Sequence, residues 1–96
     1  MIISFSDPAT ADLYHSRSTN RVRRFPSDVT KRALLKLDIL NAAHRIIDLR
    51  SPPSNRLEAL KGDLEGFYSI RVNQQWRIIF RWVDNGVVDV ALVDYH

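Results

Sequence analysis

The second half of the chain contains three runs rich in β-branched and aromatic residues, at residues 67–72, 76–83 and 87–95, and each run predicts a β-strand. Residues 73–75 (Asn-Gln-Gln) separate the first two runs, and residues 84–86 (Asp-Asn-Gly) separate the last two. Asn-Gly between two such runs is a strong hairpin signal. Because connections this short join antiparallel neighbours, we expect three consecutive antiparallel strands.

The first half predicts a short strand at residues 2–5 and then two helices. Asp7 suits the N-cap and Pro8 the first position of a helix that extends to about Ser16. A longer helix covers residues 26–43, because apolar side chains recur there at helical spacing. The apolar side chains of this stripe are Val29, Ala33, Leu34, Leu37 and Leu40.

Two adjacent prolines, Pro52 and Pro53, follow the helical region and cannot continue a helix, so residues 51–55 predict a rigid loop. Residues 46–49 predict one further helical turn, and residues 57–60 fit either a strand or a turn. A chain of 96 residues with the order β-α-α-β-β-β indicates one domain. We expect an α+β fold in which two helices pack on one face of a small antiparallel sheet.

The turn at residues 73–75 decides which side chains share a face of the sheet. A three-residue loop places Arg71 opposite Arg77, with both side chains on one face, because side chains alternate along a strand. The other face then carries an apolar row that includes Trp76 and Trp82, which we interpret as core. The arginine face must be partly wet, since an unpaired buried arginine is costly. A two-residue turn would break this parity and remains an alternative.

Basic residues are mostly arginine and are concentrated early in the chain. Eleven of the 14 basic residues are arginine, which offers phosphate two parallel donors. Residues 1–56 contain ten basic and five acidic side chains, against four and six in residues 57–96. We therefore expect the first part to dock on a polyanion. The candidate docking residues are Arg21, Arg23, Arg24, Lys31, Arg32 and Lys36.

Composition argues against several other classes of site. The chain contains no cysteine and three histidines, so neither a thiolate zinc site nor a metal cluster is expected, and no cofactor is implied. No apolar run approaches the roughly 18 residues that span a membrane. The N-terminal residues lack the basic leader of a signal peptide. We expect a protein of the cytoplasm that does not enter the membrane.

The last predicted strand leads directly into Asp94-Tyr95-His96. An apolar strand that ends in a carboxylate, a phenol and an imidazole can hold side chains that chemistry uses. If neighbouring strands bring Arg77 close to His96, a fixed guanidinium lies beside a group that titrates near neutrality. Such a pair suits phosphodiester chemistry.

Several segments of the chain together resemble the HigB branch of the RelE/ParE toxin superfamily, also called the plasmid-maintenance killer proteins. The segments are residues 49–60, 60–63 (Leu-Lys-Gly-Asp), 65–72, 75–80 and 93–96 (Val-Asp-Tyr-His). The resemblance implies a compact sheet with two helices. It also implies a bacterial type II toxin that cleaves messenger RNA on the translating ribosome, without metal, using the adjacent 2′-hydroxyl as nucleophile.

The resemblance also implies roles for individual residues. The phosphate-binding arginine of the family corresponds to Arg77, its terminal histidine to His96, and its lysine to Lys61. Tyr95 would stack on a base or orient the RNA. The remaining positions implied to contact RNA are Arg71, Asn73 and Asp94. Some relatives have a basic residue where this chain has Asn73. Of the implied roles, a phosphate contact at this turn is therefore the one that the resemblance supports least.

The implied partners are a HigA-type helix-turn-helix antitoxin in a hetero-oligomer, the ribosome and its messenger RNA, with DNA reached only through the antitoxin. Two alternatives remain open from the sequence. One is a non-catalytic relative that inhibits DNA gyrase, although such relatives generally lack the arginine and histidine that correspond to Arg77 and His96. The other is a basic module that binds RNA without cutting it.

Overall fold

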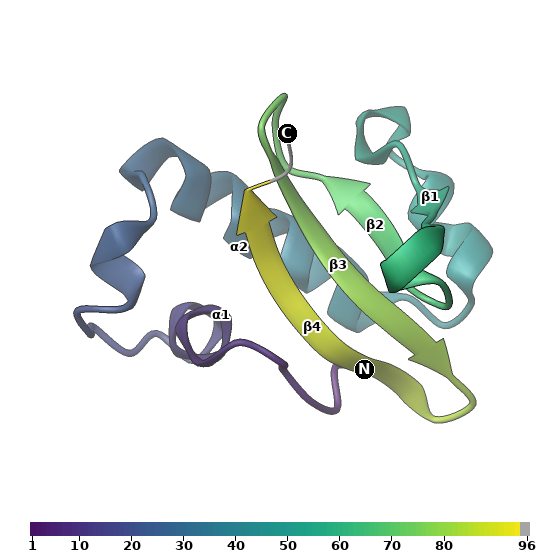
Figure 1. Cartoon of the computed structure of the whole chain (residues 1–96), viewed down its shortest axis with the longest axis horizontal. Helices are drawn as coiled ribbons and strands as arrows, with labels where there is room; N and C mark the ends of the chain where they lie inside the picture. The colour runs from purple at the N-terminus through teal and green to yellow at the C-terminus, as the bar shows by residue number, and fades with distance from the viewer. Residues whose placement is uncertain (95–96) are drawn as a thin grey trace.

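The computed structural model describes residues 1–94 and shows an α+β architecture, as predicted (Figure 1). The two α-helices are α1 (Pro8–Tyr14) and α2 (Ser27–Ala42). The four strands form an antiparallel sheet in the order β1 (Glu58–Ala59), β2 (Tyr68–Arg71), β3 (Trp76–Val83) and β4 (Gly86–Asp94). Short 3-10 turns connect them: η1 (Val22–Arg24), η2 (Ile46–Arg50), η3 (Pro53–Asn55) and η4 (Gly62–Leu64).

The predicted start of α1 is confirmed. The Asp7 side chain accepts hydrogen bonds from the backbone N–H groups of Ala9 and Thr10, which otherwise lack partners in the first turn of a helix. Pro8 occupies the first helical position, where a missing N–H costs nothing. The buried Thr10 hydroxyl accepts a hydrogen bond from the backbone N–H of Leu92 at 2.9 Å. This bond fixes α1 against β4.

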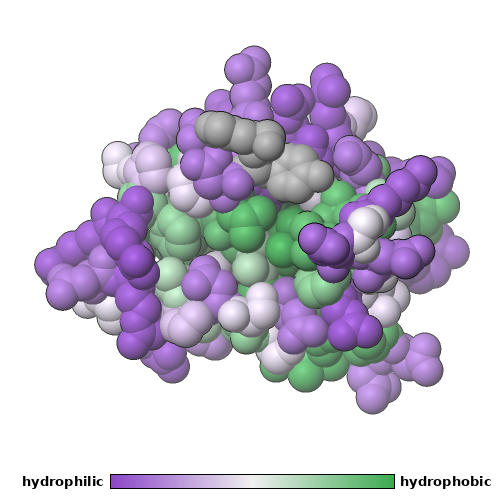
Figure 2. Space-filling view, viewed as in Figure 1, coloured by the Kyte–Doolittle hydropathy of each residue, from purple (hydrophilic) through white to green (hydrophobic). Residues whose placement is uncertain are grey.

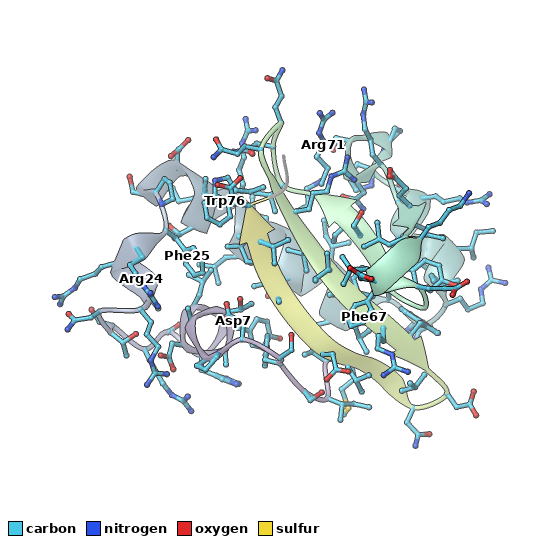
Figure 3. All side chains as sticks on the ribbon, in the orientation of Figure 1. Asp7, Arg24, Phe25, Phe67, Arg71 and Trp76 are labelled. Atoms are coloured by element: carbon cyan, nitrogen blue, oxygen red, sulfur yellow. The ribbon has the colours of Figure 1, made fainter. Side chains whose placement is uncertain are left out.

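The main hydrophobic core lies between α2 and one face of the sheet. The fully buried side chains of Leu37, Leu40, Ile70, Ile78 and Phe80 belong to one cluster that spans both layers. Trp76 and Trp82 are partly buried and pack against this cluster, as predicted. Figure 3 shows Trp76 beside Phe25, whose ring meets it edge-on with a centroid separation of 5.6 Å. Both tryptophans therefore belong to the core.

The register of β2 and β3 agrees with the three-residue loop. Arg71 is the direct partner of Arg77, and Ile70 is the partner of Ile78. The Asn73 side-chain oxygen accepts hydrogen bonds from the backbone N–H groups of Gln75 (2.8 Å) and Trp76 (2.7 Å). These two bonds close the turn and fix the register.

The strand predicted at residues 2–5 does not form. This segment makes only two isolated parallel bridges to β4, at Ile2–Val87 and Phe5–Val90. Between them, β4 contains a β-bulge, and Asp89 adopts a left-handed backbone with φ 55°. The Ser4 hydroxyl accepts a hydrogen bond from the Asp89 N–H at 3.0 Å, replacing a bond of the regular ladder. The bulge therefore prevents continuous pairing along this edge.

The face of the sheet opposite α2 carries a second, smaller apolar cluster. Leu60, Leu64 and Phe67, from the segment between β1 and β2, pack on Ile79 and Ala91. Figure 2 shows an apolar band across the middle of this face, with hydrophilic side chains on both sides. The arginine face is therefore wet only toward its ends. Among residues 1–94, the helices are too short or too polar to span a bilayer.

Candidate functional site

Three strands hold the guanidinium of Arg77 on the face opposite α2. Its Nη1 atom donates a hydrogen bond to the Ser69 hydroxyl on β2 at 3.1 Å. The same atom lies 3.7 Å from Oε1 of Glu58 on β1, the cross-strand partner of Ser69. The Arg77 side chain is only 15% exposed. Its charge is therefore fixed and partly desolvated, which strengthens its field on any phosphate that reaches it.

Ser69 and Glu58 were not among the residues singled out from the sequence. Ser69 is fully buried, and its hydroxyl oxygen accepts from a charged group, which makes a stronger hydrogen bond than a neutral pair does. The signal for Ser69 was present in the sequence, since alternation places it on the face of Arg71. Glu58 had no comparable signal, because residues 57–60 fitted either a strand or a turn, so their pairing with β2 was not predicted.

Arg71 and Arg77 are paired in the sheet, but the Arg71 guanidinium turns toward the β2–β3 loop. Its Nε atom donates a hydrogen bond to the backbone carbonyl of Asn73 at 3.1 Å. Figure 3 shows Arg71 beside this loop, at the end of β2. The two arginines therefore act at different positions, Arg77 within the sheet face and Arg71 at its rim.

Asp94 lies on the other side of the sheet from Arg77. Its direct partner across β3 and β4 is Trp76, whereas the partner of Arg77 is Val93. Directly opposed side chains share a face, so Asp94 shares the face of Trp76. Its Oδ2 atom accepts a hydrogen bond from the Gln75 side-chain amide at 3.0 Å. Tyr95 and His96, the two remaining candidates at this end, lie outside the described residues.

Lys61 is exposed and lies at the N-cap of η4, one residue beyond the buried Leu60. Leu60 is held on the sheet face by its contacts with Ile79 and Ala91, and its N–H donates to the carbonyl of Phe67 at 2.9 Å. Lys61 is therefore attached to the segment that covers the middle of the arginine face.

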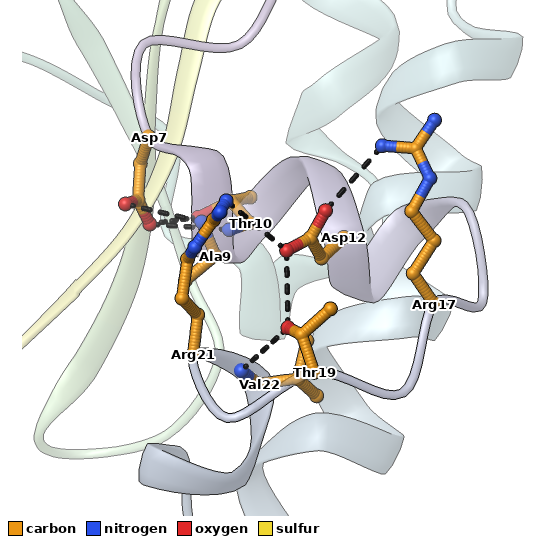
Figure 4. Close-up of polar contacts among 8 residues, drawn as sticks. All are labelled: Asp7, Ala9, Thr10, Asp12, Arg17, Thr19, Arg21 and Val22. Carbon is orange, nitrogen blue, oxygen red and sulfur yellow. Dashed lines mark hydrogen bonds and ion pairs between the residues drawn. The ribbon is translucent and has the colours of Figure 1, made fainter.

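Of the six basic residues predicted to dock on a polyanion, Arg21 also has a structural contact (Figure 4). Asp12 is buried, and its carboxylate oxygens form ion pairs with Nη1 of Arg17 and Nη1 of Arg21, each at 3.3 Å. The Thr19 hydroxyl donates to the same carboxylate at 3.0 Å. These bonds compensate the buried charge and hold the α1–α2 connection.

The other five lie in two regions. Arg23 and Arg24 are exposed on η1, and Figure 3 shows Arg24 at the left of the molecule, away from Arg71. Lys31 and Arg32 are exposed on α2. Lys36, one turn after Arg32, is half-buried, and its Nζ donates to the side chains of Ser54 (3.2 Å) and Asn55.

Burial, and to a lesser extent the charge of Arg32, lower the pKa of the Lys36 ammonium. Arg32 and Lys36 therefore lie close together beside η3. Within residues 1–94, His, Asp and Glu side chains form no group of three that could hold a metal ion.

Known proteins similar to this chain cover its whole length. The family described as RelE-like toxin of type II toxin-antitoxin system HigB matches residues 3–96. Toxin HigB-1 of Vibrio cholerae serotype O1 is 43% identical over 96 residues, which are 100% of this chain and 98% of the relative. Endoribonuclease HigB of Proteus vulgaris is 31% identical over 96 residues, 100% of both chains.

Solved structures show the same fold. A chain of the heterotetrameric YoeB-YefM toxin-antitoxin complex from Staphylococcus aureus aligns with a TM-score of 0.62 at 20% identity. The alignment covers 100% of this chain and 98% of that chain.

Proposed function

Because this chain belongs to the HigB family of RelE-like toxins from type II toxin-antitoxin systems, we propose that it is an endoribonuclease that cleaves messenger RNA on the translating ribosome. The observation that carries this proposal is the Arg77 guanidinium, fixed between Ser69 and Glu58 on a sheet face. A relative that matches the full chain bears the name endoribonuclease.

The proposed reaction needs neither a metal nor a cofactor. The 2′-hydroxyl oxygen of one nucleotide forms a bond to the adjacent phosphorus, and the bond from phosphorus to the 5′-oxygen breaks. A base removes the 2′-hydroxyl proton, and an acid protonates the leaving 5′-oxygen. Arg77 stabilises the charge that develops on the non-bridging phosphate oxygens, and Lys61 adds a second cation.

We assign proton transfer to His96, and to Tyr95 the role of stacking on a base or orienting the RNA. Imidazole titrates near neutrality and serves as acid or base. Deleting His96 is expected to slow cleavage about 100-fold to 10,000-fold, which is the usual contribution of general acid–base catalysis. Near-parental cleavage by the deletion variant, measured on ribosome-bound messenger RNA, removes His96 from the reaction.

The proposed partners follow from the same membership. We assign a HigA-type helix-turn-helix antitoxin as the inhibitor in a hetero-oligomer, with DNA contacted only through the antitoxin. The ribosome would supply the orientation of the substrate, which contributes several kcal/mol in favourable cases. The site of action is then the cytoplasm, and the exposed Arg23, Arg24 and Lys31 are the proposed contacts to ribosomal RNA.

The test compares Arg77→Ala with Arg81→Ala. Arg81 lies on the same strand and the same face, but it is exposed, with an ion pair to Asp89 at 3.6 Å. Primer extension on messenger RNA in a translation reaction measures new 5′ ends within codons. Arg77→Ala is expected to lower the rate about 100-fold to 1,000-fold. Arg81→Ala is expected to cleave like the parent, because a partly exposed ion pair contributes little.

Circular dichroism establishes that both variants are folded. Full cleavage by folded Arg77→Ala contradicts the proposed role of Arg77. A gyrase supercoiling assay run in parallel covers the non-catalytic alternative: inhibition of supercoiling without new RNA ends contradicts the proposed function as a whole. A second arm omits the ribosomes, and equal cleavage of naked RNA contradicts ribosome dependence.

A further inference from the structure

A concave site lies beside the β2–β3 loop, at the rim that Arg71 occupies. It is a cleft of about 730 Å³ between the first turns of α2, η3 and the loop. Its charged lining consists of Arg32 from α2, Arg56 after η3, Arg71 from β2, and Asp28. The cleft therefore gathers three cations and one anion from three separate parts of the fold.

The positive charge extends behind this lining. Lys36 lies one turn along α2 from Arg32 and donates to Ser54, which also lines the cleft. Like charges gathered in this way repel one another and favour an anion between them. The lowered pKa of Lys36, caused by burial and by Arg32, is consistent with this crowding.

Arg56 is held at the cleft by a costly backbone conformation. Its φ is 45° and its ψ is 55°, in the left-handed region that side chains other than glycine rarely adopt. The preceding Asn55 is fully buried and donates to the carbonyls of Leu49 (3.0 Å) and Ser51 (3.2 Å). The fold therefore fixes residue 56, where glycine would be less strained, and places an arginine there.

The rest of the lining indicates which anion fits. The remaining lining side chains are Ser54, Val72, Asn73, Gln74 and Gln75. Val72 alone is apolar in this set, so the lining offers neither an aromatic surface for a base nor the apolar centre typical of a protein interface. Guanidinium groups match phosphate oxygens with paired donors. Since Arg71 is also the strand partner of Arg77, a nucleic acid strand bound at Arg77 can continue into the cleft.

We propose that the Arg32–Arg56–Arg71 cleft binds backbone phosphates of the substrate RNA next to the cleaved bond. This inference rests on the proposed function only in taking RNA as the substrate. Arg32, predicted from the sequence to dock on the ribosome, is here assigned to the substrate, and Arg56 is a contact that the sequence did not suggest.

The experiment measures binding of a fluorescent, single-stranded 2′-O-methyl RNA, which lacks the attacking hydroxyl. Arg32→Ala and Arg56→Ala are compared with Arg50→Ala, which removes the same charge from an exposed position at the end of η2. The two cleft variants are each expected to weaken binding about 10-fold, because a lost charged hydrogen bond is of that size. A plot of the logarithm of the binding constant against the logarithm of the salt concentration should also become less steep, by about 0.7 in slope. Arg50→Ala should match the parent.

Arg56→Gly separates binding from folding. Glycine adopts the left-handed conformation without strain, so its melting temperature is expected to equal or exceed that of the parent while RNA affinity falls as for Arg56→Ala. Equal affinities of Arg32→Ala, Arg56→Ala and Arg50→Ala for the RNA overturn the inference. Loss of antitoxin binding in the cleft variants, with unchanged RNA affinity, overturns it in favour of a protein occupant.

Cleavage of ribosome-bound messenger RNA by the parent is measured separately. If the parent binds RNA through the cleft but cuts none, the proposed function fails and the cleft stands. If the parent cuts RNA and the cleft variants bind it normally, the inference about the cleft fails and the proposed function stands.

Discussion

Replacing Asn55 with alanine tests how the fold supports both η3 and the cleft. Asn55 is fully buried, and its amide nitrogen donates to the carbonyls of Leu49 and Ser51 at 3.0 and 3.2 Å. Each lost hydrogen bond costs about 1 kcal/mol, and the loss of a buried side chain's packing adds about 1 kcal/mol more. We expect a total destabilisation of about 3 kcal/mol, a large share of the stability of a small domain.

Thermal unfolding followed by circular dichroism measures this effect. For a chain of this size, about 3 kcal/mol corresponds to a fall in melting temperature of about 12 to 24 °C. Ser54→Ala is the matched control, because Ser54 is exposed and also accepts a hydrogen bond from Lys36, at 3.2 Å. It should change stability by less than about 0.5 kcal/mol.

Asn55→Asp tests whether the two hydrogen bonds to the carbonyls, and not the one from Lys36, stabilise the fold. The carboxylate keeps the volume and the acceptor for Lys36 but loses both donors to the carbonyls. We expect it to destabilise at least as much as alanine does. If Asn55→Asp is as stable as the parent, or if Asn55→Ala melts within about 4 °C of it, the reasoning that the two carbonyl bonds hold η3 is refuted.

Three further changes have defined outcomes. Ser69→Ala should slow cleavage about 10-fold and have no further effect in an Arg77→Ala background, because the serine acts through the arginine; additive losses in the double variant would contradict this. Reversing Arg23 and Arg24 to Glu should weaken ribosome binding at least about 10-fold without shifting the melting temperature, and unchanged affinity would leave them as solvated charges. Backbone hydrogen bonds from Arg45 and His44 lower the pKa of the Asp48 carboxyl from 3.8. Asp48→Asn should therefore melt below the parent near neutral pH, and the difference should shrink as the pH falls below 3.8 through the lowered pKa; a pH-independent difference would contradict this.

The pairing of the hairpin was readable from the sequence because short loops leave few registers. Three loop residues and strict alternation predicted that Arg71 faces Arg77 across β2 and β3, and the structure confirms it. The same reasoning identified Trp76 as a core residue. Such predictions succeed where the information is local.

Features that depend on distant contacts were not readable. The bulge at Asp89 shifts the alternation in β4, so Val87 and Val90 share the core although they are three positions apart. The segment carrying Leu60 covers part of the arginine face through contacts with Ile79 that no local pattern encodes. The rotation of the Arg71 guanidinium toward Asn73 depends on a single hydrogen bond, which alternation alone does not predict.

The bridges between residues 2–5 and β4 also tie the N-terminal segment to a strand that is translated much later. The Ile3 N–H donates to the carbonyl of Val87 at 2.7 Å, and the Val87 N–H donates to the carbonyl of Met1 at 2.9 Å. These contacts join the N-terminal segment to β4, although more than 80 residues separate them in the sequence. While β4 is still inside the ribosomal tunnel, Ile2 and Phe5 lack their partner, and β3 lacks the neighbour with which it shares the most extensive pairing. A chain whose β4 has not yet emerged therefore lacks the strand that pairs with β3 beside Arg77.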